Sequence, residues 1–458
     1  MSAPVKSRRE EFRELMRLAI PIAIAQGGQS LMSLVDTLVV GRASTSALAA
    51  VGLANAIFFA VSGLGMGLMM GFDPLLSQAF GARNASRARA LLWQGGWMAL
   101  FAGTVMGALV VLVPDVLPFF GYPKEQLVET RAYLFWRAPS MVTMLAFLSV
   151  RAYLQSAANT RPLVVATVAA NIFNLLADIV LVFGGGVLPE GFGPLRNIPA
   201  MGAAGAALAT FLCTVLQLAI ILLAVRSIGV EGARPIRRPV WTDLAQALRV
   251  GLPIGLHLAA EIGVFALAGA LAFKLGEASM GAHQIALSFA SLSFTIAVGI
   301  GNAGSVRVGW AVGAHNTPQA RMSGFVALAG GGSFMALSAL VFAFFPRQLA
   351  WLAGASSDVV PLLVPLMMVT AVFQVFDGLQ GVGAGVLRGA GDTRFTFLAN
   401  MVGHYAIGLP LSLVLGFGLG LGILGIWWGL CAGLISVALA LVWRFNRLSA
   451  GTLRPLEA

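Results

Sequence analysis

Charged residues are scarce in this sequence. Only 10% of the 458 residues are Asp, Glu, Lys or Arg, whereas 58% are hydrophobic, and the mean hydropathy is +0.88. About a quarter of the residues in a soluble domain are charged, so this composition excludes an ordinary soluble protein. Apolar runs of about 20 residues recur between clusters of charged or turn residues, which is typical of membrane-spanning helices. The sequence therefore predicts a polytopic membrane protein.

Cysteine and lysine are also scarce, and each shortage excludes a class of site. Cys213 and Cys431 lie inside apolar runs, so we expect packing residues rather than a disulfide or a metal pair. None of the three lysines, Lys6, Lys124 and Lys274, stands in a GxxxxGK[ST] sequence. The chain therefore lacks the P-loop that transport driven by ATP would need, and we expect no cofactor.

The apolar runs and the basic residues together predict the membrane topology. About twelve runs can be counted, and a helix lets each run satisfy its own backbone polar groups, so we expect an all-α chain of 12 transmembrane helices. Most of the 29 lysines and arginines lie in the N-terminal segment, in the connections after even-numbered spans and in the C-terminal tail. By the positive-inside rule both termini lie in the cytoplasm. This distribution explains the net charge of +11 without a nucleic-acid partner.

The sequence repeats itself at nearly one offset. Pro21 and Pro253 are separated by 232 positions, as are Pro114 and Pro346, and GARN at 81–84 and GAHN at 313–316. LQSAANTRP at 154–162 is matched by LRGAGDTRF at 387–395. Four matches in order indicate an internal duplication.

The duplication predicts two lobes of similar fold. Six spans a lobe is an even number, so both lobes enter the membrane in the same orientation and are related by an axis along the membrane normal. We expect an N-terminal lobe at 1–226, a cytoplasmic linker at 227–243 and a C-terminal lobe at 244–458. Such a pair of lobes favours a transporter that holds its substrate between them.

Acidic residues inside the apolar runs are the candidate functional groups. Glu261, Asp36 and Asp377 each lie within a predicted span, with no basic residue nearby in that span. A charge at the centre of a spanning helix costs roughly 2.5 to 3.5 kcal/mol on insertion scales, so such residues are usually functional. Asn174 and Asp178 lie one turn apart on one helix face. Desolvated carboxylates exchange protons or recruit cations, which predicts ion or proton sites.

The same residues suggest alternative roles. A structural role for Glu261, in hydrogen bonds between helices, is the alternative to an ion site. His257 and Glu261 are spaced as an i, i+4 pair, but HLAAE is not a zinc-protease motif and no third ligand is evident, so we expect His257 to pack or to line a pore. An intramembrane enzyme would need HExxH or DDxxD, and neither occurs. We therefore expect no enzyme.

The sequence resembles the multidrug and toxic compound extrusion (MATE) family, and its NorM-type bacterial branch in particular. The resemblance rests on PIAIAQGGQSLMSLVDTLVVG from Pro21, DPLLSQAFGARN at 73–84, GAHQIA at 281–286 and LRGAGDTR at 387–394, and it covers essentially the whole chain. It implies the MATE fold, with two pseudo-symmetric lobes of six helices. It also implies alternating access and export of organic cations or drugs in exchange for Na+ or H+.

The resemblance also assigns roles to particular residues. Glu261 and Asp377 match the cation site of the C-terminal lobe, where Na+ is the candidate metal. The cation or proton site of the N-terminal lobe is matched by Asp36, Asn174, Asp178 and Thr210. Pro21 and Pro253 are equivalent hinge sites in the first helix of each lobe.

The expected location and oligomeric state follow from the resemblance, and two alternative functions are open. The resemblance implies a bacterial inner membrane, contact with membrane lipids and a monomer. A flippase of the same superfamily, moving a lipid-linked substrate, is the alternative within transport, but its cavity is expected to be more basic. A membrane scaffold without transport activity would not explain unpaired buried acids in both repeats.

Overall fold

The computed structural model describes residues 6–120, 127–229 and 235–456, and these residues form helices without any β-strand. Five of the expected linker residues, 230–234, lie outside this range, as does Lys124. The α-helices are α1 Arg8–Ala43, α2 Thr45–Met70, α3 Phe72–Gly81, α4 Ala85–Val116, α5 Val128–Arg137, α6 Ser140–Ser156, α7 Arg161–Phe183, α8 Ala203–Val225, α9 Trp241–Lys274, α10 Glu277–Gly313, α11 Thr317–Phe344, α12 Pro346–Leu352, α13 Val360–Gly389, α14 Thr393–Asn400, α15 Leu409–Leu413 and α16 Gly422–Ala450. Short 3-10 helices (η1 Leu117–Phe120, η3 Gly185–Val187, η4 Glu190–Asn197) and π-helices (η5 Met401–Gly408, η6 Val414–Gly418) connect or continue them.

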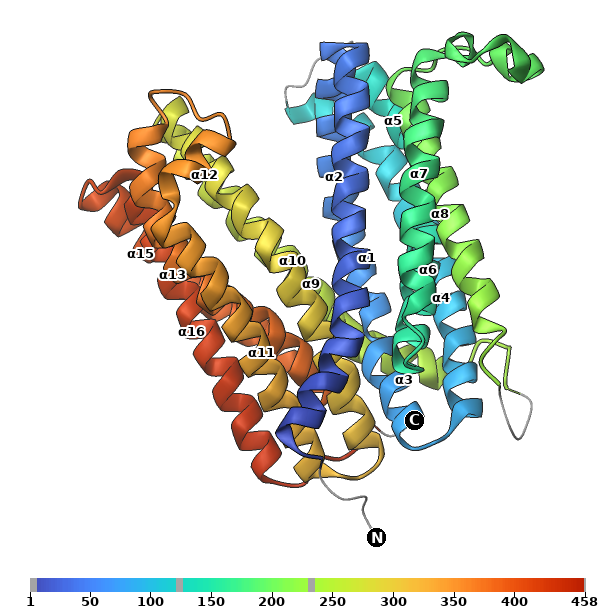
Figure 1. Ribbon diagram of the computed structural model, residues 1–458, viewed down its shortest axis with the longest axis vertical. Coiled ribbons are helices and arrows are strands. Elements are labelled where there is room, and N and C mark those ends of the chain that lie inside the picture. Colours follow the sequence, from blue (N-terminus) through green and yellow to red (C-terminus); the bar gives the residue numbers. More distant parts are fainter. Residues whose placement is uncertain (1–5, 121–126, 230–234, 457–458) are drawn as a thin grey trace. The chain divides into compact units, whose positions relative to one another are not determined.

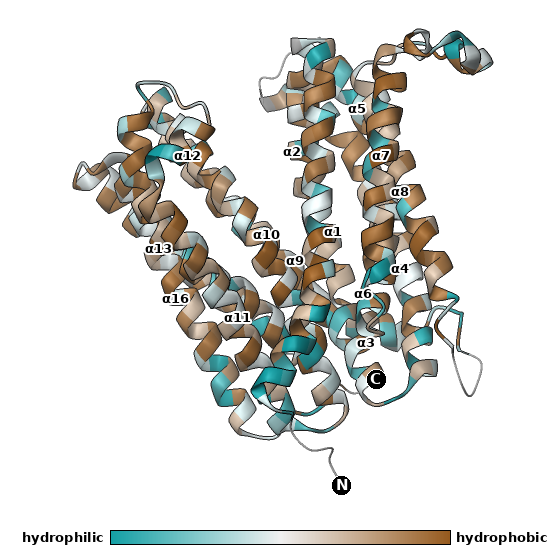
Figure 2. Cartoon of the chain, viewed as in Figure 1, coloured by the Kyte–Doolittle hydropathy of each residue, from teal (hydrophilic) through white to brown (hydrophobic). Residues whose placement is uncertain are grey.

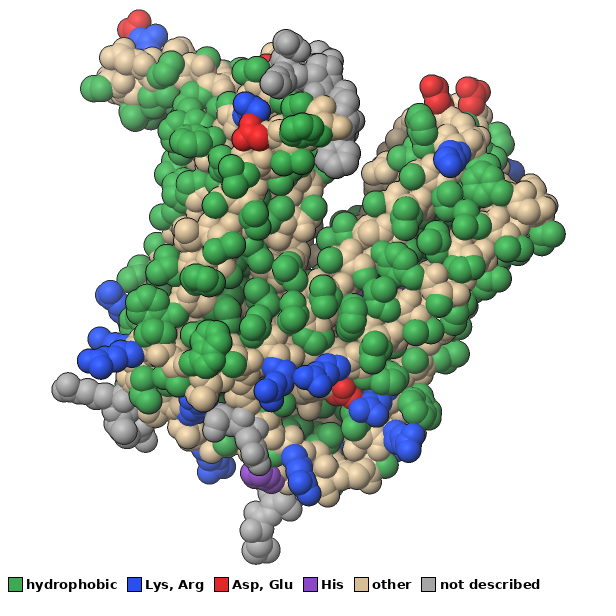
Figure 3. Space-filling view, turned by 180° about the vertical axis from the view of Figure 1, so that it is seen from behind, with side chains coloured by type: hydrophobic (Ala, Val, Ile, Leu, Met, Phe, Trp, Pro, Cys, Tyr) green, Lys and Arg blue, Asp and Glu red, His purple; other side chains and the backbone are tan. Residues whose placement is uncertain are grey.

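The helices have the length and composition of membrane spans. Among the described residues, eleven helical segments are long and apolar enough to cross a membrane. The pair α5 and α6, bent by 41°, can form a twelfth span. Hydrophobic residues cover most of the length of these helices, and their hydrophilic residues gather toward the helix ends (Figure 2). In the space-filling view, Lys and Arg gather mainly at one end of the helices (Figure 3). The exposed apolar side chains need lipid rather than water around them, which confirms a multi-pass membrane protein with the expected helical fold.

The backbone repeats itself as the sequence does. Arg83 and His315 have positive φ values of 58° and 55°, and each is followed by an asparagine that directly precedes the next helix. In each case the asparagine N–H reaches back to a carbonyl five residues earlier, which is the helix-ending bond of a Schellman motif. Ala158 (φ 57°) and Gly391 (φ 86°) end α6 and α13 in the same way. The duplication therefore extends to the geometry of individual helix ends.

Packing divides the chain into two compact units. The C-terminal unit comprises Met1–Ala23, Asp73–Asn84 and Arg249–Ala458, and the N-terminal unit comprises Ile24–Phe72 and Ala85–Leu248. This division differs from the expected lobes in three segments. The beginning of α1 and all but the first residue of α3 pack with the C-terminal helices, and residues 244–248 belong to the N-terminal unit. In α1 the division falls directly after Ala23, close to Pro21.

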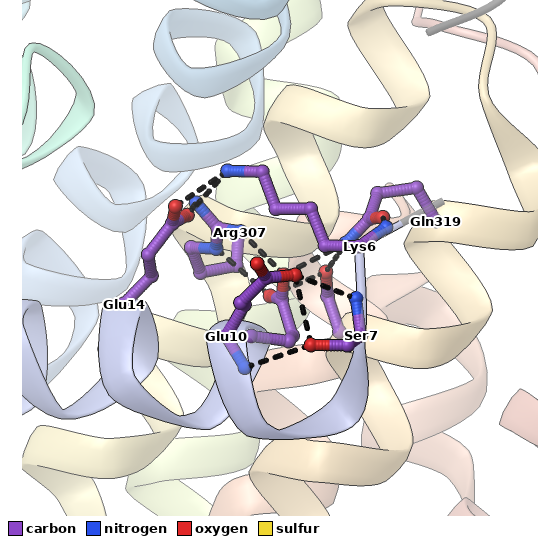
Figure 4. A network of polar contacts seen from close by, with 8 residues as sticks. Lys6, Ser7, Glu10, Glu14, Arg307 and Gln319 are labelled. Carbon is purple, nitrogen blue, oxygen red and sulfur yellow. Dashed lines mark hydrogen bonds and ion pairs between the residues drawn. The ribbon is translucent and has the colours of Figure 1, made fainter. Parts of the chain in front are cut away.

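A polar network explains why the beginning of α1 belongs to the C-terminal unit (Figure 4). Glu11 is 0% exposed and accepts two hydrogen bonds from Arg307 on α10, through Nε at 2.9 Å and Nη2 at 2.5 Å. Gln319 and Ser323 on α11 donate to the same carboxylate, each at 2.7 Å. Arg307 also pairs with Glu14. The acid inside this network is therefore fully hydrogen-bonded, as a buried charge must be.

Candidate functional site

Three helices of the N-terminal unit bring together the residues that we call the N-site: Asp36, Asn174, Asp178 and Thr210. Thr210 Oγ1 on α8 donates to Asp36 Oδ2 on α1 at 3.1 Å and also to its own helix carbonyl, Ala206 O, at 2.8 Å. Asp178 on α7 interacts electrostatically with Asp36. Asn174 lies one turn before Asp178 on the buried face of α7 and near Cys213. All four expected residues therefore belong to one buried region.

Several buried polar atoms of the N-site make no hydrogen bond with a described residue. Within the described residues, no donor reaches Asp36 Oδ1 or either carboxylate oxygen of Asp178, and the side-chain amide of Asn174 has no partner. A buried polar atom without a partner costs about 1 to 3 kcal/mol, and more if it is charged. A proton shared between the carboxylates, or a cation bound by their oxygens and the Asn174 oxygen, would satisfy these atoms. Oxygen donors of this kind suit hard cations.

Two residues of α5 extend the N-site beyond the expected set. Tyr133 is buried and donates a hydrogen bond from its hydroxyl to Asn55 Oδ1 at 3.0 Å. Arg137, one turn further along, interacts electrostatically with Asp178. Arg137 is not among the candidate residues named from the sequence. An arginine well inside a span, rather than at its end, was the signal that could have identified it.

The C-terminal unit holds the second set of residues, the C-site, which comprises Glu261, Asp377, His257 and Gln380. His257 Nε2 lies 3.3 Å from Glu261 Oε2 on the same face of α9, so the histidine contacts the acid rather than only packing. Gln380 Nε2 on α13 lies 3.5 Å from His257 Nε2 and donates to Asn400 Oδ1 at 3.1 Å. Asp377, one turn before Gln380, interacts electrostatically with Glu261.

A π-helix adds another residue near the C-site. Tyr405 in η5 donates to the carbonyl of Ala260 on α9 at 2.8 Å, beside Glu261. His404 precedes it, interacts electrostatically with Glu261 and is buried, and neither of its ring nitrogens has a hydrogen-bond partner in the described chain. Pro410 follows η5, and the missing N–H of a proline favours a wider turn before it. Sequence periodicity does not reveal such a turn.

Metal ligation of the usual transition-metal kind is not built into these sites. Among residues 6–120, 127–229 and 235–456, no group of three or more His, Cys, Asp and Glu side chains is arranged to hold a metal ion. Cys213 and Cys431 are buried. What both sites offer is carboxylate and amide oxygen at depth in the helices, which can bind a proton or a monovalent cation.

Comparisons with known proteins agree with these features. One family model, MatE, matches residues 21–180 and again residues 253–414, which confirms the internal duplication. A probable multidrug resistance protein NorM of Burkholderia mallei is 34% identical over 463 residues, covering 98% of this chain and 95% of that protein. The protein of the same name in Rhodopseudomonas palustris is 35% identical and is covered to 94%.

The fold is also found among solved structures. A multidrug resistance MATE family transporter of the MOP superfamily, solved in an outward-facing conformation, has a TM-score of 0.85 and 20% identity. The match covers 98% of this chain and 99% of that one. At this identity the likeness concerns the fold alone.

Proposed function

The chain belongs to the MatE family, and from this premise we propose that it is a secondary active multidrug efflux antiporter. It exports organic cations and drugs in exchange for Na+ or H+ by alternating access. Relatives named multidrug resistance proteins over nearly the whole chain support the substrate class. The observation that carries the exchange mechanism is the N-site, where Asp36 Oδ1 and both carboxylate oxygens of Asp178 are buried without a hydrogen-bond donor among the described residues.

Exchange follows from the chemistry of such a site. A coupling cation and a cationic drug both stabilise the same buried negative charge, either directly or through bending of the helices that carry it. Binding of one then weakens binding of the other, which is the coupling that exchange needs. We assign this role to Asp36, Asn174, Asp178 and Thr210 in one lobe and to Glu261 and Asp377 in the other, where Na+ is a candidate ligand.

The arrangement in the membrane is part of the proposal. The protein lies in the inner membrane of a bacterium as a monomer surrounded by lipid, with both termini in the cytoplasm, and it catalyses no covalent reaction. Two lobes, 1–226 and 244–458, alternate about the linker 227–243. Pro21 and Pro253 serve as their hinges, since each lies within a long helix and removes one backbone hydrogen bond.

Ethidium efflux from energised membrane vesicles tests this function. Na+ and H+ gradients are imposed separately on the parent and on Glu261→Gln, Asp377→Asn and Asp36→Asn, each at matched expression. We expect the parent to export ethidium under one of the two gradients and the variants of the coupling site to lose that export.

The set of variants separates the two lobes. Asp115→Asn serves as the control, because Asp115 is an exposed acid that pairs with Arg131 at the surface. Export by Glu261→Gln and Asp377→Asn at the parent rate would contradict a coupling role for the C-site. Export of a lipid-linked substrate without ethidium export would instead indicate a flippase.

A further inference from the structure

Arg137 distinguishes the two halves of a duplicated scaffold. It lies at the bend of 41° between α5 and α6 in the N-terminal unit. With the offset of LQSAANTRP and LRGAGDTRF, its equivalent in the second half is Thr370, inside the continuous helix α13. Thr370 is buried and donates to the carbonyl of Leu366 in its own helix at 2.8 Å. The scaffold itself therefore does not require a charge at this position.

The guanidinium of Arg137 is buried without the usual partners of a structural arginine. Arg137 is only 9% exposed, and its Nε and Nη1 make no hydrogen bond with any described residue. Its charge lies over the Phe58 ring at 4.6 Å from the ring centroid, which stabilises a cation but leaves its N–H donors free. A buried arginine normally has a carboxylate partner, because the unpaired charge is costly.

The carboxylates that this arginine can serve are those of the N-site. Asp178 lies five residues before the end of α7, Asp36 seven before the end of α1 and Arg137 nine after the start of α5, about 8, 10 and 14 Å along these helices. Arg137 interacts electrostatically with Asp178. The other titratable groups of this region, Tyr133 and Cys213, are ordinarily neutral, so one fixed positive charge faces two carboxylates.

We propose that Arg137 is a built-in counter-ion of the N-site, which limits the site to one coupling cation and promotes that cation's release. With both acids ionised, the three groups carry a net charge of −1. A single proton or Na+ neutralises the region, and binding of a second cation would give it a net charge of +1. The free donors of Arg137 can then take over the carboxylate oxygens when the cation leaves. This inference rests on the proposed exchange function of the N-site.

Competition binding on the purified, full-length protein tests the proposal. Radiolabelled tetraphenylphosphonium is displaced by Na+ at constant pH and, separately, by H+ without Na+. Arg137→Met leaves a net charge of −2, and we expect it to raise the apparent affinity for the competing cation at least about tenfold. Arg137→Lys retains the charge and should stay within about threefold of the parent.

A double variant keeps this test independent of folding. Arg137→Met/Asp178→Asn restores the net charge to −1, so we expect its cation affinity to return toward that of the parent. If Arg137→Met and Arg137→Lys change the affinity equally, or if the double variant shows no return, Arg137 has a structural role and the proposal is wrong.

The ethidium assay separates failure of this inference from failure of the proposed function. A parent protein that exports no ethidium under either gradient contradicts the proposed function, even if the binding series behaves as expected. A parent that exports ethidium, with Arg137→Met binding the cation like the parent, contradicts the counter-ion role alone.

Discussion

Glu11 and Asp178 are both fully buried carboxylates, yet their surroundings differ completely. Glu11, in the C-terminal unit, accepts hydrogen bonds from Arg307, Gln319 and Ser323. Asp178, in the N-terminal unit, accepts none from a described donor and faces a second acid. Burial alone therefore does not identify a functional acid. Complete hydrogen bonding indicates a structural role, and missing partners indicate a group that exchanges ligands.

The C-site lies between these two cases. Glu261 contacts His257, and its side chain is 17% exposed, so it is both partnered and accessible. The acids also occupy unrelated positions in the two repeats, because Asp36 corresponds to Ala268 at the common offset. The duplication supplied the helices, and each half then acquired its own acids.

The largest expected effect concerns the fully bonded acid. Glu11→Ala leaves Arg307 with one fewer carboxylate partner in a buried position, so we expect unfolding to become easier by about 3 to 5 kcal/mol. Thermal denaturation of the detergent-solubilised protein measures this change. The matched control is Glu10→Ala, an exposed acid on the same turn that accepts hydrogen bonds only from Ser7 among the described residues, and it should lower the midpoint much less. Equal midpoints for both variants would contradict the structural role of Glu11.

Neutralising the acids of the N-site should impair export rather than stability. We expect Asp36→Asn/Asp178→Asn to reduce gradient-driven ethidium export at least about tenfold, equivalent to about 1.4 kcal/mol. Thermal stability should change little, because removing two buried like charges offsets the loss of the carboxylates that face Arg137. Export rate and midpoint are measured on the same preparation. A lowered midpoint with unchanged export would show that Asp36 and Asp178 have a structural role and not a coupling role.

His257 tests the intermediate position of the C-site. His257→Gln replaces the group 3.3 Å from Glu261, and we expect export to fall about two- to threefold, as for one net hydrogen bond of about 0.5 kcal/mol. His315→Asn is a suitable control, since His315 lies in a connection and asparagine tolerates its positive φ. A tenfold or greater loss would place His257 among the essential groups of the C-site.

The smallest effect is expected at the edge of the Glu11 network. Lys6 pairs with Glu14 at 2.6 Å, but its side chain is 43% exposed. We expect Lys6→Ala to destabilise the protein by less than about 1 kcal/mol, because solvent screens such pairs. The shift should shrink further in high salt, whereas that of Glu11→Ala should not. A shift as large as that of Glu11→Ala would show that the whole network acts as one unit.

Much of the fold follows from patterns that are local in the sequence. Apolar runs of spanning length predict the helices, and the matched Gly-Ala-Arg-Asn and Gly-Ala-His-Asn segments predict a duplication whose helix ends have the same geometry. The grouping of helices was less predictable. The beginning of α1 joins the C-terminal unit because Arg307 and Gln319, some 300 positions away, hold Glu11.

The acids of both sites could be identified from the sequence, since a carboxylate in an apolar run is conspicuous. Helical periodicity did not identify their partners. Arg137 is next to a bend in an otherwise ordinary span, and His404 lies in a π-turn that changes which face of the helix it occupies. Helical periodicity assumes a straight, regular helix, so it fails at these two positions.

By itself, the sequence determined that this chain spans the membrane, that it is duplicated and that acids lie within its spans. These properties depend on hydrophobicity, chain length and local spacing, which are written along the chain. The tertiary structure alone decided which acids are fully hydrogen-bonded and which are not. That property depends on donors brought from distant helices, as Arg307 is brought to Glu11 and Arg137 to the region of Asp178.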